Sequence, residues 1–137
     1  MTYVKKDEFS EQKALCEYLS LQYPDVIFAS DLSGIRLPQG LANKIKSLKC
    51  RRGIPDLFIY EARRGYFGLA IELKATGVTI YKQDGNLKTD QHLMEQEDML
   101  KRLNEKGYLA CFCIGYSNAK AVIDEYLSKK YLKSRHN

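Results

Sequence analysis

The sequence predicts an α/β fold in which helices cover both faces of a central β-sheet. Helical and extended periodicities alternate along the chain, and two extended stretches, 57–60 and 109–114, are apolar at successive positions. Successive side chains of a strand point to opposite faces, so such stretches need cover on both sides. The length of 137 residues fits a single domain, 1–137, with a core of its own.

Four helices are predicted from apolar spacing and end signals. The first, 8–22, carries an apolar stripe and ends before a proline. A short basic helix is expected at 41–48. The longest, 90–106, has Gly107 as its stop signal, and Ser117 is expected to cap the last helix.

Four strands are predicted between these helices, and two of them form a hairpin. Residues 63–65 make the hairpin turn, and the glycine-containing stretches 31–40 and 75–88 are expected to be loops. The predicted strands are 26–29, 57–62, 69–74 and 109–114.

Composition narrows the class of protein. The four cysteines are scattered, and the first twenty residues mix charged with apolar side chains, so we expect a cytoplasmic protein with reduced thiols. No apolar run approaches the ~18 residues of a membrane span. The net charge of +5 favours a polyanionic partner. The basic tail, 129–137, is expected to fray.

A run of basic residues precedes residue 53. Such a run is often only the solvated face of a helix. Its position just before an acidic cluster favours a rim that binds DNA phosphates. The run consists of Lys44, Lys46, Lys49, Arg51 and Arg52.

Three charged side chains are predicted to meet at one point of the sheet. Asp56 opens one apolar strand, and Glu72 and Lys74 end the next on the same face of that strand. Two carboxylates and an ammonium can hold a divalent metal and polarise a phosphate, which is the chemistry of a metal-dependent nuclease. Taken singly, Glu-x-Lys also serves as a solubility gatekeeper of strands, and Pro-Asp is common in turns.

A further acid falls on the apolar stripe of the first helix. Glu11 lies four residues before Leu15, whereas Glu17 falls on the opposite side. A carboxylate on a buried stripe needs a partner, so Glu11 either belongs to a site or reaches water at the edge of the stripe.

The sequence is similar to the VRR-NUC domains of the PD-(D/E)xK nuclease superfamily, in the small stand-alone form found in phages and bacteria. The similarity runs from about 11 to 126, and two motifs carry most of it: Gly53-Ile54-Pro55-Asp56 and Ile71-Glu72-Leu73-Lys74. This resemblance implies a restriction-endonuclease-like core with a mixed central sheet and helices on both faces.

The resemblance also implies a metal site. By analogy, Asp56 and Glu72 bind Mg²⁺ or Mn²⁺, with the carbonyl of Leu73 as a backbone ligand and Glu11 completing the shell. Oxygen ligands of this kind suit both ions. The sequence is compatible with one metal or with two.

Two more catalytic positions follow from the family. Lys74 resembles the lysine that orients the attacking water and steadies phosphate charge. The family glutamine of the following helix is Gln96, on the apolar stripe, or Gln91, at the start of the helix.

Small stand-alone relatives resemble Holliday-junction resolvases, which act as homodimers on branched DNA. The implied function is a structure-specific DNA endonuclease that hydrolyses phosphodiester bonds. Two non-enzymatic alternatives are a basic nucleic-acid-binding module and a phage assembly protein.

Overall fold

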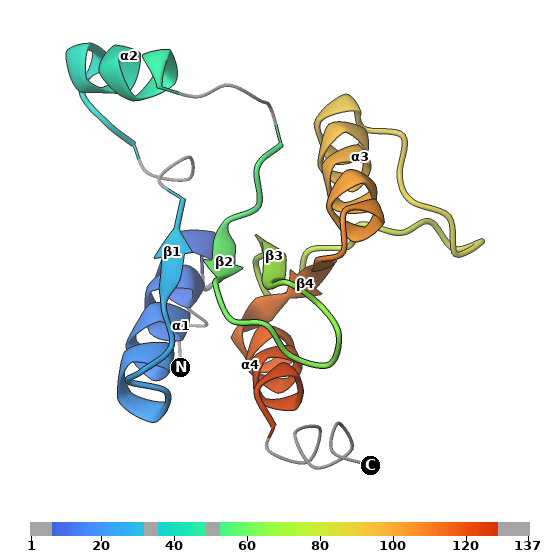
Figure 1. Cartoon of the computed structure of the whole chain (residues 1–137). Coiled ribbons are helices and arrows are strands. Elements are labelled where there is room, and N and C mark those ends of the chain that lie inside the picture. The colour runs from blue at the N-terminus through green and yellow to red at the C-terminus, as the bar shows by residue number, and fades with distance from the viewer. Residues whose placement is uncertain (1–6, 32–35, 49–52, 129–137) are drawn as a thin grey trace, which may run out of the picture.

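The computed structural model describes residues 7–31, 36–48 and 53–128. Figure 1 shows a central sheet with α3 on one face and with α1 and α4 on the other. The elements in chain order are α1 Glu8–Gln22, β1 Phe28–Ser30, α2 Gln39–Ser47, β2 Leu57–Ile59, β3 Leu69–Lys74, α3 Gln91–Glu105, β4 Leu109–Ile114 and α4 Gly115–Tyr126. In the described part of the chain, no helix is both long enough and apolar enough to span a membrane.

The sheet has the spatial order β1-β2-β3-β4 and is mixed. Neighbouring strands are antiparallel from β1 to β3, whereas β3 and β4 run parallel and are connected through α3. Every residue of β3 except Lys74 is buried, as expected for a strand covered on both faces. The structure therefore confirms the predicted α/β class with helices on both faces of the sheet.

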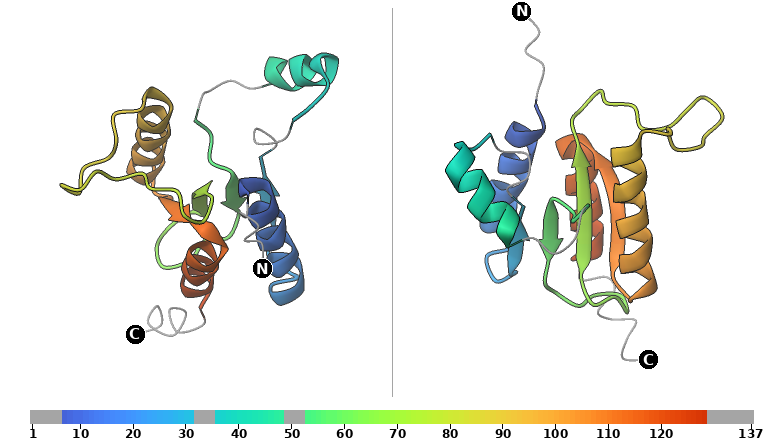
Figure 2. Two further views of the ribbon diagram at one scale, coloured as in Figure 1. Left: turned by 180° about the vertical axis from the view of Figure 1, so that it is seen from behind. Right: turned by 90° about the horizontal axis from the view of Figure 1, so that it is seen from above.

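Each face of the sheet has its own apolar core. The larger core lies beneath α1 and α4, and Tyr126 of α4 is fully buried in it. The smaller core lies beneath α3, where Ala70 and Ala110 pair across β3 and β4 and meet Leu100. The absence of bulky side chains at these two positions leaves room for α3, which runs alongside β4 (Figure 2).

The elements lie close to their predicted positions, and the differences have local causes. Strand β2 ends at Ile59, not at residue 62. The chain then turns through Arg64 and Gly65, both with positive φ, a geometry typical of a two-residue hairpin turn. The turn predicted at 63–65 is thus confirmed; the preceding strand is shorter than predicted, and β3, Leu69–Lys74, has its predicted bounds. Strand β1 begins at Phe28, later than the predicted start at residue 26. Helix α2 begins at Gln39, two residues before its predicted start.

The cap of α4 was predicted wrongly. The helix begins at Gly115, directly after β4, and Ser117 lies inside it and is exposed. At the start of the helix, the side chain of Asn118 hydrogen-bonds to the backbone: its Oδ1 accepts a hydrogen bond of 2.8 Å from the backbone N of Ile114. Gly115 has a φ of 83°, which lets the chain pass from strand to helix without a loop.

We expect Gly115→Ala to lower the free energy of unfolding by roughly 1–3 kcal/mol, because it forces a β-carbon into a left-handed backbone conformation. That β-carbon would also overlap the hydroxyl of Thr76. The matched control is Gly40→Ala in α2, where no atom lies within 4 Å of the new β-carbon and helix propensity favours alanine. Equal unfolding midpoints for the two variants in denaturant titrations would contradict this account of the β4–α4 junction.

Candidate active site

The carboxylates of Asp56 and Glu72 come together at one end of the sheet, on the face toward α3. Strand register pairs Leu57 with Ile71, which places Asp56 beside Glu72 on adjacent strands. The two residues are each 3 % exposed. Asp56 Oδ2 accepts a hydrogen bond of 2.8 Å from the backbone N of Leu73. Asp56 is therefore fixed to the end of β3, next to the Glu-x-Lys pair.

Gln96 of α3 connects the glutamate and the lysine of β3. Its Nε2 donates to Glu72 Oε1 at 2.7 Å, and its Oε1 accepts from Lys74 Nζ at 2.7 Å. Gln96 is 5 % exposed, whereas Gln91 is exposed and hydrogen-bonds to Glu95. Of the two glutamines, the structure places Gln96 against the acids.

His92 lies one helical turn before Gln96, and its part in the site was not foreseen from the sequence. The Nε2 atoms of His92 and Gln96 are 3.2 Å apart. A neutral imidazole with its proton on Nδ1 can accept the second amide proton of Gln96 there. This contact would fix which end of the amide faces Glu72. The i, i+4 spacing of His92 and Gln96 on α3 was the sequence signal from which this contact could have been predicted.

Burial disfavours the ionised form of both acids. Burial, and then the neighbouring charge of Asp56, raises the pKa of Glu72 to about 9. Burial also raises the pKa of Asp56, against the lowering effects of its hydrogen bonds. Glu72 Oε2 is buried and has no hydrogen-bond partner among the described residues. Without a further cation the pair therefore retains a proton near neutral pH.

This donor set fits a hard divalent cation. Within the described residues, no cluster of three His, Cys, Asp or Glu side chains is arranged to hold a metal by itself. Magnesium commonly needs only one or two protein carboxylates, because waters and substrate phosphates complete its shell. The free, buried oxygen of Glu72 beside Asp56 is the position that a cation would satisfy.

Glu11 is buried, at 2 % exposure, but its partners differ from those expected of a metal ligand. Its carboxylate accepts hydrogen bonds from the backbone N of Thr76 at 2.7 Å and of Tyr116 at 3.1 Å, and from the Thr76 hydroxyl. These donors belong to the segment after β3 and to the start of α4. Glu11 thus joins three elements just beyond Lys74, and Glu17 is exposed on the other side of α1, as predicted.

Glu8 of α1 interacts electrostatically with the charged residues of the site. It is half-buried, and burial followed by the charge of Asp56 raises its pKa, while Lys74 and His92 lower it. Asp7, whose Oδ1 accepts from the N of Ser10 at 2.7 Å, caps the helix immediately before it. The helix predicted at 8–22 already included Glu8, one turn before Glu11, but the sequence did not show that its charge reaches the acid pair.

Of the five predicted DNA-binding residues, two lie on α2, away from the acid pair, and three lie outside the described residues. Lys44 and Lys46 are exposed on α2, which buries none of its residues and stands apart on the α3 side of the sheet (Figure 1). The remaining three, Lys49, Arg51 and Arg52, lie outside the described residues.

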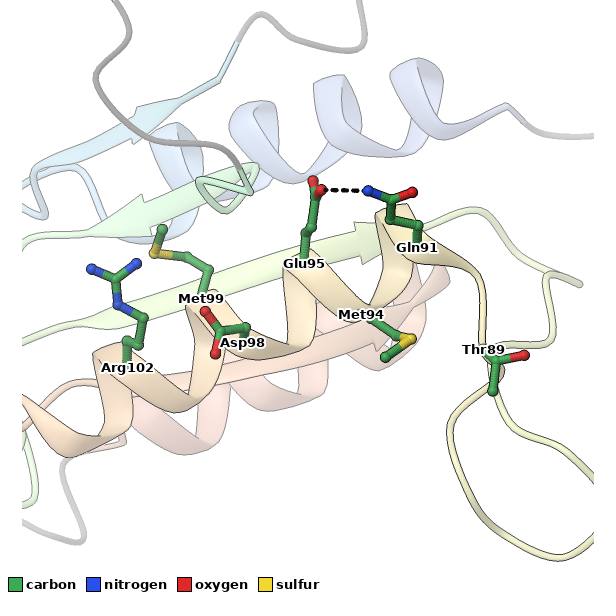
Figure 3. A pocket seen from close by; sticks show the side chains of 7 residues that line it. All are labelled: Thr89, Gln91, Met94, Glu95, Asp98, Met99 and Arg102. Atoms are coloured by element: carbon green, nitrogen blue, oxygen red, sulfur yellow. Dashed lines mark hydrogen bonds between the residues drawn. The ribbon is translucent and has the colours of Figure 1, made fainter.

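A surface pocket lies along the flank of α3, and neither Asp56 nor Glu72 lines it. Figure 3 shows side chains of α3 lining it, with Glu95, Met99 and Arg102 turned to one side of the helix. The other lining residues are Thr89, Gln91, Met94 and Asp98. Its mixture of acidic, basic and thioether groups offers no metal-binding set, so the candidate active site is the buried acid pair and not this pocket.

A mixed sheet with paired acids and a lysine at one end defines the class of nuclease-like α/β proteins. Comparison with known proteins identifies the family within this class. Residues 7–116 match the model of the VRR-NUC domain, and the chain belongs to that family. A solved structure titled "VRR_NUC domain protein" has a similar fold, with a TM-score of 0.61 and 23 % identity over 93 % of this chain and 91 % of that chain. No curated protein matches.

In the absence of metal, we expect the free energy of unfolding to fall as the pH rises from about 5 to 9. The folded protein retains a proton on Glu72 up to about pH 9, whereas the unfolded chain loses it near the ordinary value of 4.5. The folded state binds more protons in this interval, so raising the pH destabilises it. Glu72→Gln should flatten this dependence in denaturant titrations with EDTA, and Glu17→Gln should leave it unchanged. A wild-type stability that is constant from pH 5 to 9 would contradict the shared proton.

Proposed function

We propose that this protein is a metal-dependent, structure-specific DNA endonuclease that hydrolyses phosphodiester bonds. One observation carries the proposal: two carboxylates are buried side by side, one of their oxygens has no partner among the described residues, and a lysine is fixed beside them. Membership of a nuclease family supports it. Burial of such a pair is unfavourable unless the acids bind something in return.

Asp56 and Glu72 would hold Mg²⁺ or Mn²⁺, with the carbonyl of Leu73 as a backbone ligand. Such an ion, when bound, polarises the scissile phosphate and lowers the pKa of a bound water. The hydrogen bond from Leu73 N to Asp56 Oδ2 leaves Oδ1 of that carboxylate for the ion. The unpartnered Oε2 of Glu72 is the second available oxygen.

Lys74 supplies positive charge where the phosphate gains negative charge. Gln96 holds Lys74 Nζ at 2.7 Å and Glu72 Oε1 at the same distance, so the ammonium and the carboxylate keep a fixed separation. Preorganised charge of this kind stabilises a transition state without the cost of reorganisation. His92 supports the arrangement by accepting from Gln96.

The two acids of α1 have different proposed roles. Glu11 positions the end of β3, because its carboxylate receives donors from Thr76 and Tyr116. Glu8 adds negative charge near Asp56, where it favours a bound cation.

The proposed substrate is DNA, with branched DNA preferred, and the proposed assembly is a homodimer. A net charge of +5 and the exposed lysines of α2 favour a polyanion. Paired cuts across a junction require two active sites, which a two-fold dimer provides.

The experiment that tests this function is DNA cleavage with Mg²⁺, with Mn²⁺ or with EDTA. We expect Asp56→Asn, Glu72→Gln and Lys74→Ala each to lower the cleavage rate on the order of a hundredfold or more. Thermal unfolding should show that all three variants fold, and Lys74→Ala should still bind Mn²⁺ in calorimetry. Cleavage at the wild-type rate by either acid variant would remove the acid pair from the mechanism.

Three matched variants separate the roles of the acids of α1. Glu11→Gln should lower the free energy of unfolding by about 1–3 kcal/mol, because an amide cannot accept from all the donors that the carboxylate satisfies. Glu8→Gln should leave stability nearly unchanged but raise the Mn²⁺ concentration needed for half-maximal cleavage. Glu17→Gln should change neither quantity. A loss of metal affinity in Glu11→Gln at full stability would instead make Glu11 a metal ligand.

Assembly and DNA preference are tested together. Light scattering should give a dimer, and four-way junctions should bind more tightly than linear duplex, with an affinity that falls steeply with salt. Lys46→Glu should weaken binding to all DNA forms alike, since phosphate contacts carry no sequence information. Lys13→Glu, exposed on α1 at the opposite face, is the control. A monomer that binds and cuts linear and branched DNA equally would refute the junction preference.

A further inference from the structure

Four aromatic side chains form a connected cluster at the other end of β2. Phe58 is at its centre, with ring centroids 4.6 Å from Tyr60 and 5.4 Å from Tyr108. Phe67 extends the cluster, 5.9 Å from Tyr108. The outer two rings are largely in water, with Tyr60 57 % and Phe67 66 % exposed. Contiguous exposed rings of this kind commonly mark a binding surface.

Two glycines make the cluster possible. A β-carbon at Gly68 would lie 3.1 Å from Phe58 Cε1, and one at Gly107 would lie 2.6 Å from Phe67 Cε2. The rings therefore rest on bare backbone, Phe58 over the start of β3 and Phe67 over the turn after α3. The cluster is built into the fold and does not depend on a flexible segment.

The cluster lies on the face of the sheet that carries the acids. Asp56, Phe58 and Tyr60 are alternate residues of one strand and its extension, so they share a face. Each step between them spans about 6.7 Å. On this face α3 covers β3 and β4, but Tyr60 and its neighbour Ile27, which is 70 % exposed, remain in water. A DNA strand that runs from the acid pair along β2 would therefore pass over the rings.

We propose that Phe58, Tyr60, Phe67 and Tyr108 form a stacking surface for unpaired bases of the DNA strand held at the acid pair. Phenyl and phenol rings stack on bases of any sequence, but only on bases that are not already stacked in a duplex. The continuity of the rings with Asp56 along β2 favours this occupant over a second copy of the chain. The proposal rests on the proposed nuclease function and narrows the branched DNA proposed there to forms with unpaired bases at the acid pair.

The test is binding in EDTA, where no cleavage occurs, of three fluorescent probes: a short oligodeoxythymidine, a paired duplex, and a duplex with a single-stranded tail. Tyr60→Leu and Phe67→Leu keep an apolar side chain but remove the rings, and both positions are exposed enough for the variants to fold. Each should weaken binding of the oligodeoxythymidine and the tailed duplex about tenfold, and binding of the paired duplex much less. Tyr60→Phe, which keeps the ring, should bind the oligodeoxythymidine far better than Tyr60→Leu. Tyr81→Ala, at an exposed aromatic residue of the 75–90 loop, is the matched control.

Quenching of 2-aminopurine in the single strand should report stacking and should disappear in the leucine variants. Equal binding of every probe by wild type and leucine variants would overturn the proposal. A change from dimer to monomer in light scattering with unchanged oligonucleotide binding would overturn it as well, and would make the cluster a protomer interface. Ring-dependent binding without cleavage in any metal would support the stacking surface and refute the nuclease function, so the two failures are distinguishable.

Discussion

Two carboxylates buried side by side are the constraint around which this fold is arranged. Asp56 and Glu72 are almost inaccessible to water, so burial raises the cost of ionising both of them, and the charge of Asp56 raises that of Glu72 further. Three contacts partly offset this cost: Leu73 N donates to Asp56, Gln96 donates to Glu72, and Lys74 lies within reach of the same glutamine. The one oxygen left over among the described residues, Glu72 Oε2, is the group that a bound cation would satisfy under the proposed function.

All layers of the molecule contribute to that site. The sheet supplies the acids and the lysine, α3 supplies Gln96, and α1 reaches the end of β3 from the opposite face through Glu11. The larger core, which includes fully buried Tyr126, keeps α1 and α4 in place against the sheet. Stability and chemistry are therefore coupled, because a shift of either helix layer changes the separation between the acid pair and Lys74.

Much of this could be predicted from the sequence, because strand alternation is a strict rule. The alternation placed Glu72 and Lys74 on one face. The apolar stripe of α1 left Glu11 either in a site or at the wet edge of the stripe, and the structure buries it. Partners across space could not be predicted in this way: no local pattern shows that Glu11 receives donors from Thr76 and Tyr116, 65 and 105 residues away. The junction at Gly115 was missed for a related reason, since a positive φ lets a strand continue directly into a helix without the loop that the Ser117 signal implied.

Under the proposed function, a divalent cation replaces a proton that Asp56 and Glu72 retain together. Calorimetric titration of Mn²⁺ into the protein, in two buffers of different ionisation enthalpy at neutral pH, measures this directly, because metal binding to a protonated site releases protons. Net proton release is expected on binding to the wild type, with little binding or release in Asp56→Asn. Tight Mn²⁺ binding without proton release, or equal affinity in that variant, would contradict it.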